Sequence, residues 1–159
     1  LAFCLENNTP LCHVKPHGAF YNMAAKDPVL ARAVCRGVKA VSSELILLAL
    51  SGSEMCRAAE EENLPYRQEV FADRAYLPDG NLVPRGQDGA VITNEEEAVV
   101  RVVKMVTEGK VTANDGSELS ICADSICLHG DNEKAVLFAE KISAALQKAD
   151  VAVTPLKNL

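Results

Sequence analysis

The sequence predicts an α/β protein with parallel strands, and two observations support this. Short apolar runs rich in β-branched residues alternate with longer segments whose apolar residues recur at helical spacing. Polar residues with chemically active side chains directly follow several of the apolar runs. Strands separated by helices connect by right-handed crossovers into a parallel sheet, and functional groups gather at the carboxyl ends of its strands. We expect an open sheet or part of a βα barrel.

Each expected element has support in its local sequence. Asp27 precedes Pro28 as an N-cap before a first-turn proline. Asn94 precedes an acidic first turn, and Gly109 follows the same helix. The opening residues are typical of the end of a helix, so we expect residues upstream of this sequence. Strands are predicted at Leu11–Lys15, Glu44–Leu50, Arg67–Phe71 and Ser120–Leu128, and helices at Ala19–Ala25, Pro28–Val41, Ser53–Asn63, Asn94–Glu108 and Asn132–Ala149.

One long irregular stretch, residues 72–89, breaks the βα rhythm. Its Pro78-Asp79-Gly80 predicts a tight turn between two short extended segments. Loops of this length in compact domains are usually either functional or disordered. Because this one carries Asp73, Arg74 and Arg85, we expect a role in the active site, with a plain surface excursion as the alternative.

Composition limits the function classes. A chain of 159 residues is the size of one domain, so we expect a single domain over residues 1–159. A net charge of −6 argues against a nucleic-acid surface, because binding phosphates requires clustered Lys and Arg. No apolar run approaches the roughly 20 residues that span a bilayer. We expect a cytoplasmic protein that binds neither nucleic acid nor membrane.

The cysteines follow no metal-binding or disulfide pattern. The sequence contains no C-x-x-C and no zinc-finger spacing. Most lie in apolar runs, where a free thiol behaves as a small buried hydrophobe. We expect reduced, structural thiols at Cys4, Cys12, Cys35, Cys56, Cys122 and Cys127.

Three groups of residues could carry chemistry. In the first, Lys15 and His17 lie at the carboxyl edge of a strand, and Gly18 lets the chain turn, so a cation and an imidazole would face one cavity. In the second, alternation could point Glu69, Phe71 and Asp73 to one side, where the two carboxylates beside a cation could hold a substrate or activate water. Solvated surface residues and an ion-pair edge are the alternatives.

The third group is the run His129-Gly130-Asp131, which follows an apolar strand. Asp131 can cap the helix that follows, and Gly130 can permit the turn. His129 would lie beside a helix N-terminus, whose free N–H groups can bind an anion. The sequence contains no P-loop, no G-x-G-x-x-G and no H-E-x-x-H, so any nucleotide would be bound by other means.

Together these groups resemble the LamB/YcsF family, and the resemblance spans nearly the whole chain in the family's order. The segments that carry it are Val14–Asn22, Glu69–Tyr76, Leu82–Arg85 and Leu128–Asp131. The family usually has Leu at the position of Phe20. It also begins with an Asp-Leu-Asn-Cys-Asp-Leu-Gly-Glu strand that this sequence lacks. We therefore expect an incomplete barrel without its N-terminal strands.

The resemblance implies a parallel βα barrel of the glycoside hydrolase/deacetylase type. It also implies a cytosolic subunit of an ATP-dependent 5-oxoprolinase that works with two further subunits, B and C. Together they would cleave 5-oxo-L-proline to L-glutamate, with hydrolysis of ATP to ADP and phosphate. ATP would bind this chain or one of its partners, and both a metal requirement and a homo-oligomer remain open.

These considerations predict the site and leave two alternatives. Metal-dependent hydrolysis of the deacetylase type would use His17, His129 and Asp131 as candidate ligands. A non-catalytic subunit that positions its partners is the other alternative. For the main hypothesis, we expect catalytic roles for His17, His129 and Asp73, substrate binding by Lys15, Arg74, Arg85, Asp131 and Glu69, no assigned metal ligand, and one cavity at the carboxyl edge of the sheet for this set.

Overall fold

The computed structural model describes residues 2–130 and 135–156. The chain divides into two compact units, which we describe separately. The first comprises Leu1–Ala49 and Ser53–Arg67, and the second comprises Leu50–Gly52 and Gln68–Leu159. The expectation of a single domain stays a prediction.

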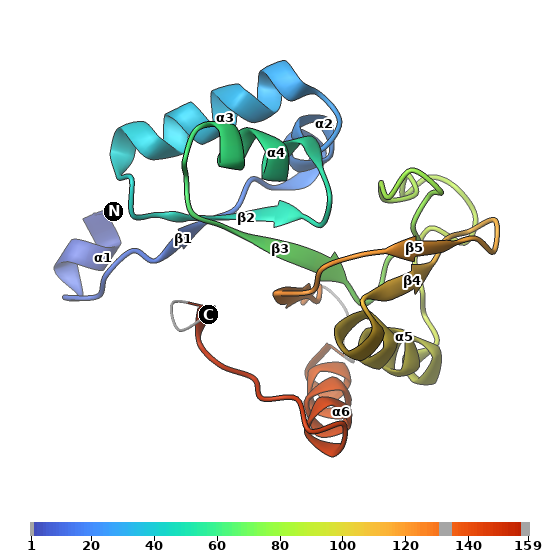
Figure 1. Ribbon diagram of the computed structural model, residues 1–159. Coiled ribbons are helices and arrows are strands. Elements are labelled where there is room, and N and C mark those ends of the chain that lie inside the picture. The colour runs from blue at the N-terminus through green and yellow to red at the C-terminus, as the bar shows by residue number, and fades with distance from the viewer. Residues whose placement is uncertain (1, 131–134, 157–159) are drawn as a thin grey trace. The chain divides into compact units, whose positions relative to one another are not determined.

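The first unit contains a parallel strand pair and helices. Strand β1 pairs with β2 in parallel, with His13 opposite Ile46 and Val14 opposite Leu47. Helices α3 and α4 pack against each other (Figure 1). The elements that begin in this unit are α1 (Ala2–Glu6), β1 (His13–Val14), α2 (Gly18–Ala24), α3 (Pro28–Val41), β2 (Ile46–Leu50), α4 (Glu54–Glu61) and β3 (Tyr66–Phe71).

Helix α3 has both of the predicted ends. The Asp27 carboxylate accepts hydrogen bonds from the backbone N–H groups of Val29 and Leu30, at 2.8 and 3.2 Å. Pro28 occupies the first turn, where its missing N–H costs nothing. The helix buries one apolar face, which includes Ala31 and Cys35. Local capping and periodicity therefore determine this element.

The second unit combines parallel and antiparallel pairing. Strand β3 pairs in parallel with β6, with Glu69 opposite Ser125 and Phe71 opposite Cys127. Parallel strands with intervening helices confirm the α/β class. The further elements of this unit are α5 (Glu95–Glu108), β4 (Lys110–Thr112), β5 (Glu118–Ser120), β6 (Ser125–Cys127) and α6 (Ala135–Lys148).

The prediction of one strand over Ser120–Leu128 is wrong. The chain forms the end of β5, which pairs antiparallel with β4, and then the separate strand β6. Between them, the Asp124 carboxylate accepts a hydrogen bond from the backbone N–H of Gln68 at 2.8 Å. The backbone N–H of Cys122 donates to the Ser51 hydroxyl, also at 2.8 Å. These contacts with distant residues satisfy polar groups between β5, which pairs with β4, and β6, which pairs with β3.

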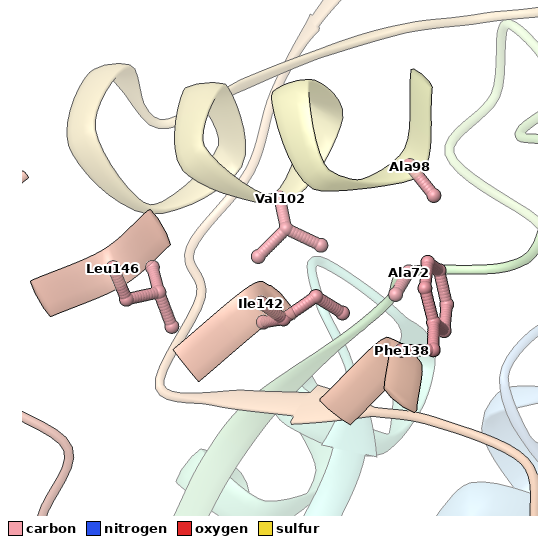
Figure 2. Packing of buried hydrophobic residues seen from close by; sticks show 6 residues of the cluster. All are labelled: Ala72, Ala98, Val102, Phe138, Ile142 and Leu146. Carbon is pink, nitrogen blue, oxygen red and sulfur yellow. The ribbon is translucent and has the colours of Figure 1, made fainter. Parts of the chain in front are cut away.

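Helices α5 and α6 enclose the apolar core of the second unit. Figure 2 shows Val102 of α5 beside Ile142 of α6, with Ala72 and Phe138 at one end of the same cluster. The Asn94 side chain caps α5 by accepting from the N–H groups of Glu96 and Glu97. At the other end Gly109 has φ = 63°, in the left-handed region that suits a glycine C-cap.

The expectation of reduced, structural thiols stays a prediction. No disulfide joins any two of the six cysteines in the described ranges. Cys35 and Cys56 are buried in the first unit, whereas Cys122 is exposed, which the expectation of buried thiols missed. Burial raises the pKa of Cys35 to about 11, with a smaller contribution from Glu62.

None of the described helices is long and apolar enough to cross a membrane.

Truncation of Val102 should destabilise the protein. Val102 is fully buried between α5 and α6, so Val102→Ala leaves a cavity and should lower the free energy of unfolding by roughly 2 kcal/mol. Val100 lies on the same helix but is 68% exposed, so Val100→Ala should change stability by less than about 0.5 kcal/mol. Urea denaturation followed by circular dichroism measures both. Equal effects of the two substitutions would contradict this packing.

The thiols should differ in reactivity. At mildly alkaline pH, iodoacetamide should alkylate the exposed Cys122 quickly and leave Cys35 unmodified until the protein unfolds. Since the folded pKa of Cys35 lies above its ordinary value, folding stability should fall as pH rises through the range from 9.0 to about 11. Cys35→Ala should abolish that part of the pH dependence. Mass spectrometry and denaturation at several pH values test both statements.

Candidate functional site

The candidate site forms where β3 and β6 end. Because Phe71 lies opposite Cys127, the two strands reach their carboxyl ends at the same level. The backbone N–H of Ala72 continues the ladder by donating to the Cys127 carbonyl at 3.2 Å. Asp73 and His129 each lie two residues beyond these paired positions. The strand-end rule therefore brings a carboxylate and an imidazole together.

Asp73 and His129 form a hydrogen-bonded pair. Asp73 Oδ2 and His129 Nδ1 are 2.7 Å apart, and both side chains are largely buried, with 17% and 28% exposed. The Phe71 ring stacks on the imidazole with ring centroids 6.0 Å apart. Asp73 Oδ1 is buried and has no hydrogen-bond partner among the described residues.

The hydrogen bond between Asp73 and His129 fixes the tautomer of the neutral imidazole. A carboxylate only accepts hydrogen bonds, so a neutral His129 must carry its proton on Nδ1 and donate it to Asp73. Its Nε2 then holds a lone pair. Stacking on Phe71 restricts rotation of the ring. An imidazole held in this way can take a proton from water or from a substrate group.

A cavity of about 250 Å³ opens beside the pair. This volume lies below the roughly 300–1,000 Å³ typical of sites for drug-sized ligands, so the cavity suits a smaller molecule. Arg85 supplies a cation to its wall, and Glu95, which is paired with Lys141, supplies a carboxylate. The lining residues are Asp73, Arg85, Val91, Ile92, Thr93, Glu95, Leu128, His129, Ala135 and Phe138.

Arg74 is buried and binds backbone carbonyls. Its Nε donates to the Ala90 carbonyl at 3.3 Å, and its Nη2 donates to the Val83 carbonyl at 2.5 Å. Burial lowers the pKa of Arg74, the charge of Arg85 lowers it further, and Asp73 opposes both. The predicted substrate-binding role of Arg74 is untested and stays a prediction.

Tyr76 is buried where the chain leaves β3. Its hydroxyl accepts a hydrogen bond from the backbone N–H of Phe71 at 2.9 Å, and burial raises its pKa. The predicted tight turn is confirmed, because the backbone N–H of Leu77 donates to the Asn81 carbonyl and that of Gly80 donates to Leu77. Contacts between residues that are close in the sequence therefore shape the start of the irregular stretch.

The other predicted site residues belong to the first unit, to β3 or to the part of the chain outside the described residues. Lys15 and His17 belong to the first unit, where the Lys15 ammonium lies 5.6 Å from the centre of the Tyr21 ring. His17 precedes α2 without a side-chain capping bond. Glu69 is buried in β3 opposite Ser125. Asp131 lies outside the described residues, and the single cavity predicted for the whole set stays a prediction.

Sequence reasoning missed several residues of the cavity. Thr93 and Glu95 line it at the start of α5, where the sequence indicated only a helix cap and its acidic first turn. Phe71, which alternation places on the same side as Asp73, stacks on His129, and the sequence did not predict this contact. In the described ranges no three His, Cys, Asp or Glu side chains lie close enough to hold a metal ion. The metal requirement is untested.

Comparison with known proteins gives consistent matches. The model of the LamB/YcsF family matches residues 1–159. A Clostridium beijerinckii protein, named as the A subunit of 5-oxoprolinase, is 51% identical over 158 residues, which cover 99% of this chain and 62% of the relative. A protein of the same name from Coprothermobacter proteolyticus is 53% identical over 154 residues, 97% of this chain and 59% of the relative.

A solved structure agrees with these matches. The crystal structure of a lactam utilization protein from Thermus thermophilus is 42% identical and superposes with a TM-score of 0.85. The match covers 96% of this chain and 60% of that protein. The chain thus spans about three fifths of the length of the relatives it matches.

Asp73→Asn should change the tautomer of His129. A carboxamide can donate its own N–H to Nδ1, and this would move the imidazole proton to Nε2. The ¹⁵N chemical shifts of the two ring nitrogens at mildly alkaline pH report this exchange directly. Asp88→Asn, which alters an exposed carboxylate in the same irregular stretch, should leave the shifts unchanged. Identical spectra for wild type and Asp73→Asn would show that Asp73 does not set the tautomer.

Proposed function

The chain belongs to the LamB/YcsF family, and from this premise we propose that it forms a large part of the A subunit of a 5-oxoprolinase. The proposed reaction is cleavage of 5-oxo-L-proline to L-glutamate, coupled to hydrolysis of ATP to ADP and phosphate. Relatives of that name, about half identical over nearly the whole chain, support the assignment. The relatives are longer, so the activity is proposed for the complete protein with its partners.

We also propose where the protein acts, the fold of the complete protein and its partner subunits. The protein is proposed to be a cytoplasmic parallel βα barrel of the deacetylase type, of which these residues form part. The name of the relatives refers to one subunit of an enzyme, and on this basis we propose two partner subunits, B and C. The sequence has no P-loop, so ATP would bind this chain by other means or bind one of the partners.

The hydrogen bond between Asp73 and His129 beside a small cavity is the observation that carries the mechanism. Lactam hydrolysis needs one proton removed from water as it attacks the carbonyl carbon. It needs another delivered to the ring nitrogen as the C–N bond breaks. An oriented imidazole can perform both transfers in turn. Asp73 holds the ring and stabilises its charged form between the two steps.

Coupling to ATP makes chemical sense for this substrate. An unstrained five-membered lactam is a poor electrophile, and phosphorylation of its carbonyl oxygen activates the adjacent carbon. Attack of water and cleavage of the C–N bond then leave an acyl phosphate, and its hydrolysis by a second water gives L-glutamate and phosphate. Arg85 lines the cavity and is always charged, so it suits the substrate carboxylate or a transferred phosphate. Lys15 is proposed to bind an anion as well, and His17 is the second candidate for proton transfer.

Substitutions in the complete complex should separate these roles. With the full-length protein and its partners, His129→Gln should lower turnover by about 10²–10⁴-fold and remove the acidic limb of the pH–rate profile. Arg85→Ala or Lys15→Ala should weaken substrate binding or transition-state stabilisation by a few kcal/mol, on the order expected for loss of one electrostatic donor. Arg57→Ala, at an exposed surface pair, serves as the control.

Two outcomes would require another assignment. If His17→Gln and His129→Gln both retain turnover and its pH dependence in folded protein, proton transfer must fall to Asp73, Glu69 or a residue outside this chain. If the wild-type protein contributes only to assembly, so that all of these variants support full activity of the complex, it positions its partners and carries no chemistry.

A further inference from the structure

We propose that Arg74 is a positioning residue, which holds the Arg85 segment against the cavity instead of contacting the substrate. We define the Arg85 segment as residues 84–89, all of them exposed. The inference rests on the proposed function only in giving Arg85 the task of binding an anion. Its structural basis is independent of the reaction.

The Arg74 guanidinium ties together both ends of the segment. Val83 precedes the segment and Ala90 follows it, and Arg74 donates to the carbonyl oxygens of both, at 2.5 and 3.3 Å. Arg74 itself is only 5% exposed. One buried side chain therefore holds Val83 and Ala90, the residues on either side of the Arg85 segment.

The backbone around Arg74 joins the same segment to the catalytic pair. Ala75 pairs with both flanks, because its N–H donates to the Ala90 carbonyl and its carbonyl accepts from Val83, each at 3.0 Å. The carbonyl of Asp73 accepts from the N–H of Ile92 at 2.9 Å, and Ile92 lines the cavity. Movement of this strip would displace Asp73 and the wall together.

Apolar packing offers little alternative support for the segment. The local core consists of Ala75, Val83 and Ala90, with Leu77 packed against it. These are mostly small side chains, and burial stabilises in proportion to apolar area. The carbonyl contacts of Arg74 are charge-assisted, and such hydrogen bonds are stronger than neutral ones. Polar contacts thus provide much of the restraint on the segment.

The geometry requires arginine. The guanidinium fork presents several donors in one plane and can reach two carbonyls at once, whereas lysine carries a compact charge on a flexible stem. A second arginine supports the arrangement, since Arg101 Nη2 donates to the carbonyl of Arg74 at 3.1 Å. Arg74→Lys therefore keeps the charge and removes the bridge between the two flanks.

Hydrogen exchange of the full chain tests the structural part without any activity. In Arg74→Lys the backbone amides of Ala75, Val83, Ala90 and Ile92 should exchange at least about tenfold faster, in line with the loss of one hydrogen bond to a charged group. Arg57→Lys, at an exposed ion pair, should leave them unchanged. Unchanged exchange in Arg74→Lys would overturn the proposal. Global unfolding of both Arg74→Lys and Arg74→Gln would also overturn it, because positioning predicts a retained fold.

A double-mutant cycle in the complete complex tests the functional part. Arg74→Lys should raise the KM for 5-oxoproline about tenfold with a smaller change in kcat, and it should add nothing in an Arg85→Ala background. Fully additive effects would show that Arg74 does not act through Arg85. If Arg85→Ala itself leaves KM unchanged, the proposed role of Arg85 fails, while the exchange experiment still decides whether Arg74 holds the segment.

Discussion

The parallel pairing of β3 with β6 is the constraint on which the candidate site depends. It places Phe71 opposite Cys127, so that Asp73 and His129 emerge level with each other and can form their 2.7 Å hydrogen bond. A slip of one residue would turn every side chain of a strand to its other face and separate the pair. The long-range bonds around β6, from Asp124 to Gln68 among them, stabilise this register. The chemistry thus relies on contacts that are remote from it in the sequence.

Elements with local signals could be predicted from the sequence, and those decided at long range could not. The bounds of Pro28–Val41 are confirmed at both ends, because the Asp27 cap and the first-turn proline act within a few residues. The region 120–128 was predicted as one strand because it contains two apolar runs, which Asp124 and Ser125 separate. The break between β5 and β6 is set by partners such as Ser51, which lies 71 residues before Cys122. The β4–β5 hairpin was missed although it has a local signal, since Asn114-Asp115-Gly116 forms its turn with φ = 89° at Gly116.

The same distinction applies to the site. The strand-end rule predicted a cavity that includes Asp73 and His129, since both follow apolar runs, and these two side chains are hydrogen-bonded. It could not give the partners of Arg74, because backbone carbonyls have no sequence signature and an arginine beside a carboxylate suggests a ligand site. Glu95 escaped notice because an acidic first turn is explained by the helix dipole alone. The position of Glu95 in the first helical turn therefore did not indicate that it also lines the cavity.

The tautomer of His129 restricts the order of events in the proposed reaction. Because Asp73 accepts a hydrogen bond from Nδ1–H, the neutral ring has only a lone pair to offer at Nε2, and it must act first as a base. Removal of a proton from water would then precede protonation of the lactam nitrogen by the same ring. The imidazolium formed between these steps lies beside a buried carboxylate, which stabilises it. An electrophile activated beforehand is therefore required, and phosphorylation by ATP supplies it in the proposed reaction.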